Sequence, residues 1–176
     1  LVLKWHRWNI ARGLTRVLSG VNHAFVANPS NCNLPGLESA SVLPNIPFST
    51  GDLMRPYKDS EGSNFNVMVI GSYDYEPNVE GIDWLVKKVW PQVVKVMPEA
   101  RLHIFGSNMS EAMKMRWTAV PAVEALGYAE TLEAAYGESA LSICPVLRGA
   151  GSNIKVIESV AFGRLCLLTE AAARGY

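Results

Sequence analysis

From residue 67 onward, short continuous apolar runs alternate with segments in which apolar residues recur at helical spacing. The runs are typical of buried strands, and the recurring spacing is typical of amphipathic helices. The strands are expected at Val67–Ile70, Arg101–Phe105, Val123–Leu126, Leu141–Val146 and Leu165–Leu168. The helices are expected at 79–97, 110–117, 131–138 and 152–162. Strands that alternate with helices in this way predict a doubly wound, Rossmann-like α/β fold, with a parallel sheet and helices on both faces.

The first expected helix carries two local signals. Asn78 stands where it would cap the start of the helix, and Pro91 is expected to kink or break it. The first 64 residues have a less regular pattern. Residues 1–21 are spaced as an amphipathic helix with a basic opposite face, and short strands are expected at 23–27 and 41–43. A turn-rich loop at 28–33 separates them, and residues 49–64 are expected to form a linker.

The composition fits one globular domain with a sizeable core, because 49% of the 176 residues are apolar. A net charge of zero argues against a general nucleic-acid binder. No apolar run approaches the roughly 20 residues that span a bilayer, and no signal peptide is apparent. The three scattered cysteines form neither a disulfide framework nor a zinc motif, which favours a reducing, cytoplasmic location. Cys144 and Cys166 are expected in the core, and Cys32 is expected to be exposed.

The N-terminal segment is basic, since every charged residue before Glu38 is positive: Lys4, Arg7, Arg12 and Arg16. Beside them stand Trp5 and Trp8, which leaves two interpretations of residues 1–20. They form either a helix lying on the inner face of a membrane or, as we favour, a helix whose tryptophans pack into a preceding domain. Because the chain starts with Leu1 rather than Met and ends at Tyr176 soon after a strand, we expect a fragment of a longer protein.

The turn Arg148-Gly149-Ala150-Gly151-Ser152, between a strand and a helix, has the composition of an anion site. Glycines let a phosphate approach the backbone, and the N–H groups at a helix start point at it. Lys155 adds a positive charge, and Glu158 lies one turn further on the same face, where it can accept hydrogen bonds from a ribose diol. The segment therefore predicts a nucleotide site at the carboxyl edge of the sheet, where Gly71, Gly106 and Gly127 also fall.

Other interpretations of this turn stay open. Ile154 replaces the third glycine of the dinucleotide fingerprint, and no Gly-Lys-Ser/Thr follows as in a P-loop. An NAD-binding oxidoreductase module nevertheless remains one alternative. A second is a degenerate domain kept for protein contacts, in which Lys155 is an ordinary solvated lysine paired with Glu158.

The block from Gly149 to Gly163, GAGSNIKVIESVAFG, resembles the donor-binding signature of the retaining glycosyltransferases of family four, which have the GT-B fold. Other landmarks resemble that family in order and spacing. Residues 42–45 resemble its interdomain hinge, 69–73 with 77–79 the first strand and helix of its C-terminal domain, 100–106 the second strand, and 126–128 the loop that meets the base. The resemblance covers nearly the whole chain.

The resemblance implies a nucleotide-sugar donor, UDP- or GDP-linked, with no cofactor and no metal, since no Asp-x-Asp cluster is present. It implies that Lys155 counters phosphate charge and that Glu158 binds the ribose hydroxyls, which makes these two the candidate catalytic residues. The backbone from Gly149 to Ser152 would meet the diphosphate or sugar. The implied donor-binding set is Gly71, Ser72, Tyr128, Arg148, Gly149, Ala150, Gly151, Ser152 and Asn153.

The chain departs from the family pattern at two places. Ala150 stands where many members have a glutamate that touches the donor sugar. The sequence Tyr73-Asp74-Tyr75-Glu76-Pro77-Asn78 replaces the usual arginine and lysine clamp on the diphosphate, and Arg148 is the candidate substitute. Residues 1–37 resemble the last helix and strand of the N-terminal domain, and 38–176 the nucleotide-sugar-binding domain without its final elements. We therefore expect a transferase of polysaccharide or glycolipid synthesis that needs its N-terminal domain, with the isolated chain inactive.

Overall fold

The computed structural model describes residues 16, 18, 20–27, 29–34, 36–43, 65–149, 152–174 and 176. The chain divides into two compact units, one formed by residues 1–45 with 174–176 and the other by residues 46–173. Most of the expected helix at 1–21 and the whole expected linker at 49–64 lie outside the described residues. None of the helices in the described ranges is long and apolar enough to cross a membrane.

The smaller unit contains two short parallel strands, β1 (Phe25–Val26) and β2 (Ser41–Val42), which confirms the strands expected there. The expected loop between them contains a 3-10 helix, η1 (Pro29–Asn33). Cys32 is half-buried rather than exposed, because its thiol points to the carbonyl oxygen of Ala40 at 3.6 Å. The expectation of an exposed cysteine was wrong, because the polar sequence around Cys32 does not indicate that Ala40 packs beside its thiol.

The larger unit contains a five-stranded parallel sheet in the order β5-β4-β3-β6-β7. Its strands are β3 (Asn66–Ser72), β4 (Arg101–Ser107), β5 (Val123–Gly127), β6 (Leu141–Cys144) and β7 (Leu165–Leu168). All were predicted, and β7 has the predicted bounds. β3 and β4 extend beyond their expected ends at Ile70 and Phe105, because Gly71 and Gly106 pair with each other in the ladder.

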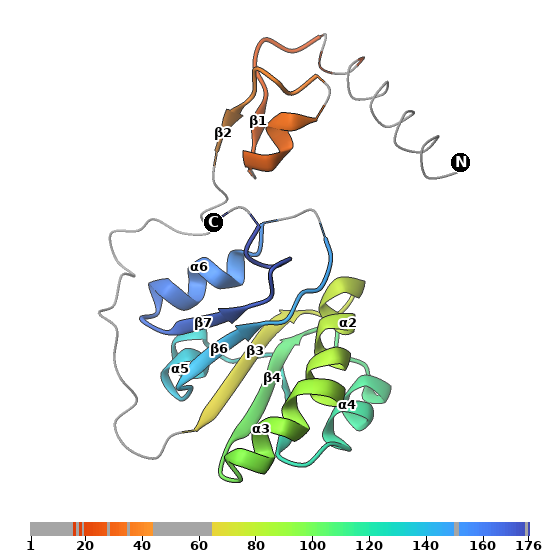
Figure 1. The fold of residues 1–176 in the computed structure, drawn as a ribbon, viewed down its shortest axis with the longest axis vertical. Helices are drawn as coiled ribbons and strands as arrows, with labels where there is room; N and C mark the ends of the chain where they lie inside the picture. Colours follow the sequence, from red (N-terminus) through yellow and green to blue (C-terminus); the bar gives the residue numbers. More distant parts are fainter. Residues whose placement is uncertain are drawn as a thin grey trace. The chain divides into compact units, whose positions relative to one another are not determined.

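Helices cover both faces of the sheet (Figure 1). They are α2 (Glu76–Trp84), α3 (Trp90–Val96), α4 (Glu111–Thr118), α5 (Leu132–Gly137) and α6 (Ile154–Ala161). Side chains alternate between the faces of a strand. Val69 of β3 therefore packs on the side of α2, α3 and α4, and Met68 on the side of α5 and α6. This confirms the predicted doubly wound α/β fold.

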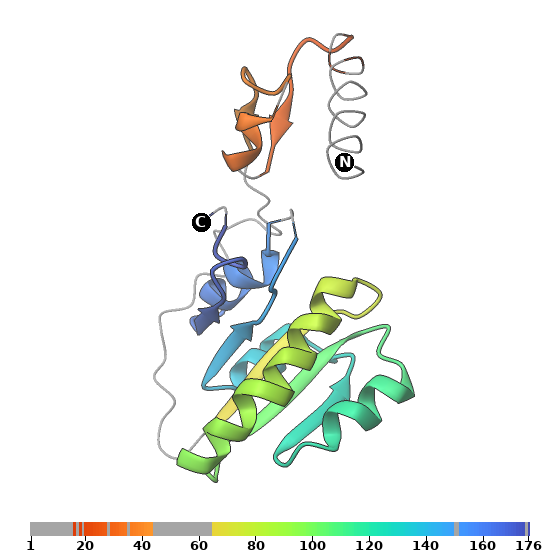
Figure 2. The same cartoon turned by 45° about the vertical axis from the view of Figure 1, so that its right-hand side comes forward.

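The long helix after β3 is interrupted next to Pro91, as the sequence predicted. A π-helical turn, η2 (Leu85–Val89), separates α2 from α3 because proline cannot donate the ladder hydrogen bond. In Figure 2 the yellow-green stretch from α2 to α3 crosses in front of the central strand. The predicted cap was wrong: Tyr75 precedes the helix and Asn78 lies in its first turn, because Pro77 lets the helix start earlier.

The neighbouring strands β3 and β4 approach closely at Gly71 and Gly106. Gly106 has a φ of 149°, and a Cβ atom placed on it would lie 1.8 Å from the Gly71 carbonyl oxygen and 2.6 Å from the Tyr73 ring. Tyr73 occupies that space and donates its hydroxyl to the Phe105 carbonyl oxygen at 2.8 Å. A side chain at position 106 would therefore force β3 and β4 apart just where they reach the carboxyl edge.

Gly106→Ala is expected to lower the free energy of unfolding by roughly 3 kcal/mol or more, because overpacking against backbone is added to an unfavourable φ. Urea titration followed by circular dichroism measures this change. Gly137→Ala is the control, since a Cβ atom there meets nothing within 4 Å. Equal stabilities of the two variants would contradict the proposed close approach.

Candidate functional site

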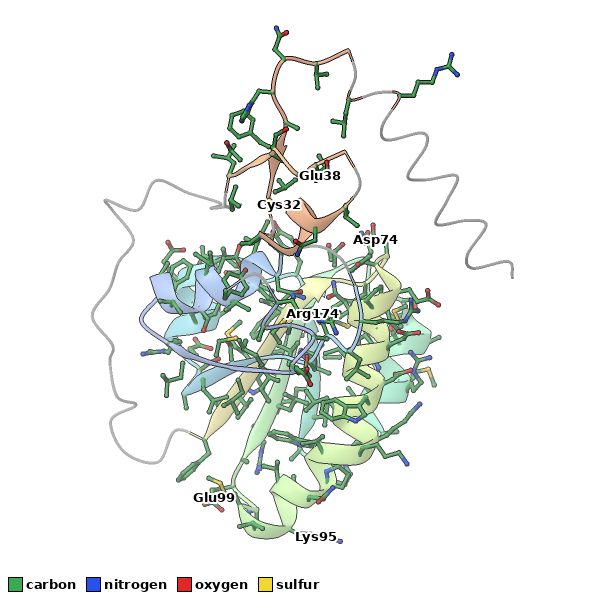
Figure 3. The ribbon with its side chains drawn as sticks, turned by 45° about the horizontal axis from the view of Figure 1, so that its top comes forward. Cys32, Glu38, Asp74, Lys95, Glu99 and Arg174 are labelled. Carbon is green, nitrogen blue, oxygen red and sulfur yellow. The ribbon has the colours of Figure 1, made fainter. Side chains whose placement is uncertain are left out.

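A cavity of about 450 Å³ opens at the carboxyl edge of the sheet, between the end of β3 and the start of α6. Its lining residues are Ile70, Gly71, Ser72, Tyr75, Asn78, Ser152, Asn153, Ile154, Lys155 and Glu158. Figure 3 shows Asp74 at this edge, and Lys95 and Glu99 at the opposite end of the unit. The cavity thus brings together six of the predicted site residues, Gly71, Ser72, Ser152, Asn153, Lys155 and Glu158.

The start of α6 forms one wall of this cavity. Asn153 precedes the helix, but its side chain does not cap it and instead donates to the Ala172 carbonyl oxygen at 3.1 Å. The opposite face of α6 is anchored on the sheet, where the Ser142 hydroxyl donates to the Ser159 hydroxyl at 2.8 Å. Because Val156 and Ser159 face the core, Lys155 and Glu158 are turned toward the cavity.

Lys155 is half-buried and is held by a neutral partner. Its Nζ atom donates to Asn78 Oδ1 at 2.7 Å. Burial lowers the pKa of Lys155, and the nearby Cys144, Glu158 and Cys166 partly offset this. Among the described residues Lys155 forms no ion pair with Glu158, so the interpretation as a solvated surface pair does not hold here.

Glu158 is also half-buried, and burial raises its pKa above the usual range, while the charge of Lys155 acts in the opposite direction. A carboxylate in this position has lost water, and among the described residues it forms no ion pair that would offset this loss. Such a group is disposed to accept hydrogen bonds from a ligand that enters the cavity. Perturbed pKa values of this kind are concentrated at functional sites.

A second hollow of about 280 Å³ adjoins the first and shares Ile70 and Gly71 with it. Tyr128 lines this second hollow and is 81% exposed, so the loop predicted to meet a base lies next to the predicted diphosphate site. Gly127 turns the chain there with a φ of 77°.

Two serine side chains lie where the two hollows meet: Ser72 lines the first hollow and Ser107 lines the second. The hydroxyl oxygens of these residues are 2.9 Å apart. Ser72 also donates to Asp74 Oδ1 at 2.5 Å, which lowers the pKa of Asp74.

Arg148 does not line the main cavity. Its guanidinium is exposed and donates from Nε and Nη2 to Glu80, each at 2.7 Å, and from Nη2 to Glu76 at 3.1 Å. This pairing lowers the pKa of Glu80. Gly149 has a φ of 141° and lies beside the Tyr75 hydroxyl, in a smaller hollow of about 120 Å³. Ala150 and Gly151 lie outside the described residues.

Residues 64–175 match the family model described as "Glycosyl transferases group 1". The chain belongs to this family. The curated relative described as "Uncharacterized 44.6 kDa protein in cps region", from Klebsiella pneumoniae, is 27% identical to this group 1 family member over 133 residues, which are 70% of the chain and 34% of that protein. The chain therefore spans about a third of the length of this relative.

Solved structures share the fold of this chain. A mutant of S. aureus TarM, in complex with Fondaparinux, alpha-GlcNAc-glycerol and UDP, aligns with a TM-score of 0.68 at 13% identity over 89% of this chain and 31% of its own. The pneumococcal O-GlcNAc transferase GtfA, in complex with UDP and GlcNAc, aligns with a TM-score of 0.63 at 16% identity over 90% of this chain and 32% of its own. At these identities the likeness concerns the fold.

Four residues that line the cavity were not predicted as site residues: the apolar Ile70 and Ile154, and the polar Tyr75 and Asn78. Asn78 was assigned to a helix cap, and Tyr75 was given no role. The signal that could have found them is their place in the loop and first helical turn directly after β3, at the edge where ligands bind in parallel sheets.

Glu158→Gln is expected to stabilise the ligand-free protein at neutral pH, because a pKa raised on folding means that the folded state binds more protons than the unfolded state. Stability from this group is present below the unfolded pKa of about 4.3 and is lost as the pH rises through the raised folded value. Unfolding free energies of both proteins, measured from below the unfolded pKa of glutamate up to neutral pH, test this prediction. A variant less stable than the parent across this range would show that Glu158 has a stabilising partner.

Proposed function

We propose that this glycosyltransferase binds a nucleoside diphosphate sugar in the cavity between β3 and α6, with a UDP-sugar as the first candidate. The observation that carries the proposal is the pair of half-buried, oppositely charged groups, Lys155 and Glu158, that line this cavity without pairing with each other. Two proteins of the same fold have been crystallised with UDP, which supports uracil as the base. A GDP-sugar is the alternative donor.

Each group has a defined task in the proposed complex. Lys155 donates to the diphosphate, whose negative charge grows when the bond to the sugar breaks, so that stabilising the leaving group is the main electrostatic contribution. The N–H groups at the start of α6 add to this. Glu158 accepts hydrogen bonds from the ribose hydroxyls, and the hollow beside Tyr128 receives the base.

The remaining parts of the proposal concern the whole enzyme. Transfer with retention, without a metal or cofactor, rests on the resemblance of residues 149–163 to family four. A role in polysaccharide or glycolipid synthesis rests on the same resemblance, and the Klebsiella relative is named for a cps region. We propose that an N-terminal domain supplies the acceptor site, that the isolated chain binds the donor without transferring it, and that the enzyme works in the cytoplasm. Contact of residues 1–20 with a membrane stays a prediction, since most of that segment lies outside the described residues.

Calorimetric titration of the purified chain with UDP, GDP, ADP and NAD tests the proposal. One nucleoside diphosphate is expected to bind, and Glu158→Ala is expected to weaken its affinity roughly tenfold or more, because it removes at least one hydrogen bond to a charged group worth about 1.5–3 kcal/mol. Glu99→Ala is the matched control, since this exposed glutamate lies at the opposite end of the unit (Figure 3).

Two results would contradict the proposal. Binding of NAD in place of every diphosphate would favour the oxidoreductase alternative. Binding of none of the four by folded protein would favour a degenerate domain kept for protein contacts.

A further inference from the structure

Asn78 joins two segments that are far apart in the sequence. Its Nδ2 atom donates to the Ser72 carbonyl oxygen at 2.8 Å, and its Oδ1 atom accepts from Lys155 Nζ at 2.7 Å. The side chain therefore links the carboxyl end of β3 to the first turn of α6. Its orientation is fixed, because an ammonium can only donate and a reversed amide would place its own donors against that ammonium.

The backbone leaves space for this contact. A Cβ atom on Gly71 would lie 3.1 Å from Asn78 Nδ2 and 3.4 Å from Lys155 Nζ, so a side chain there would require the Asn78 amide to shift by a few tenths of an ångström. Asn78 also has no role as a helix cap, since Tyr75 precedes α2. Its carboxamide is thus committed to Ser72 and Lys155.

The neutrality of the amide matters for the charge of the cavity. Among the described residues that line the cavity, Lys155 is the single cation. A carboxylate at position 78 would hold the lysine as firmly but would cancel its charge. An amide oxygen favours the ammonium form and leaves both the charge and two of its three N–H donors for a ligand.

We propose that Asn78 is a positioning residue, which aims the Lys155 ammonium at the diphosphate and keeps it protonated without neutralising it. The proposal rests on the proposed donor function of this cavity. In this role Asn78 partly compensates for the arginine and lysine that bind the diphosphate in the family pattern and that are missing after β3. It acts through Lys155 and makes the start of α2 part of the donor site.

Several titratable groups face Lys155 and must be considered with it. Glu158 lies on α6, Cys144 on β6 and Cys166 on β7, and each favours the ammonium form. Tyr136 of α5 donates its hydroxyl to the Lys155 carbonyl oxygen at 3.4 Å, and Tyr75 lines the cavity from the loop before α2. None of these groups is altered by a substitution at position 78, so a change in the pKa of Lys155 reports on the Asn78 contact.

The test compares Asn78→Ala with Asn78→Asp in the complete chain. The pKa of Lys155 is followed by NMR of ¹³C-methylated lysines without nucleotide, with Lys155→Arg to assign the signal, and UDP affinity is then measured across the same pH range. Asn78→Ala is expected to lower the pKa of Lys155 and to weaken UDP binding about tenfold. Because Lys155 then loses its proton at lower pH, the pH at which UDP affinity falls is expected to decrease as well. Asn78→Asp is expected to raise that pKa and yet weaken binding at every pH.

Opposite shifts in pKa with the same loss of affinity cannot arise from a folding defect. Asn66→Ala is the control, because Asn66 starts the same strand and donates to a backbone carbonyl, that of Glu138, at the far end of the sheet. If the parent protein binds UDP and Asn78→Ala leaves both the pKa of Lys155 and the pH dependence of UDP affinity unchanged, the positioning role is contradicted, while the proposed donor function stands. If the parent binds no nucleoside diphosphate, the proposed donor function fails, and the positioning role fails with it.

Discussion

The parallel pairing of β3 with a strand on each side is the constraint on which the site depends. Val67 and Met68 pair with β4 on one side and with β6 on the other, so the three strands run in the same direction with their starts aligned. Their carboxyl ends consequently reach the same edge of the sheet. Residues as distant as Asn78 and Lys155 meet only because the loops after β3 and β6 leave the sheet side by side. The close contact of Gly71 with Gly106 fixes this edge on the β4 side.

The helix α6 contributes to the core with one face and holds two half-buried charged groups on the other. One of its faces is buried through Val156 and Ser159, and the other holds Lys155 and Glu158 in the cavity. Burial opposes the charged form of both residues, and neither has a charged partner within the range of an ion pair among the described residues. Packing on the core side therefore offsets a cost on the cavity side, an arrangement that is typical of functional sites.

The strands and the two faces of the sheet could be predicted because they depend on local periodicity, and β7 had its predicted bounds. The errors have a common cause. Asn78 satisfies the local rule for a helix cap, but its partners, Ser72 and Lys155, are set by tertiary contacts. Likewise, nothing near Cys32 indicated that Ala40 would cover its thiol. Lys155 and Glu158 were predicted as site residues because their spacing on one helix face already places them together. Their lack of mutual pairing could not be predicted, because it depends on the tertiary hydrogen bond from Lys155 to Asn78 of α2.

The position of Arg148 shows how the charges at this edge are divided. Glu76 and Glu80 are one helical turn apart on α2, and both accept hydrogen bonds from its guanidinium. To reach a diphosphate, Arg148 would have to leave two carboxylates, and this exchange of one anionic partner for another gains little in exposed surroundings. Lys155 has no such competitor, because its partner is a neutral amide. The same helix, α2, thus holds one cation away from the cavity through Glu76 and Glu80 and directs the other into it through Asn78. In the proposed donor complex, recognition of the diphosphate therefore falls to Lys155 and the start of α6.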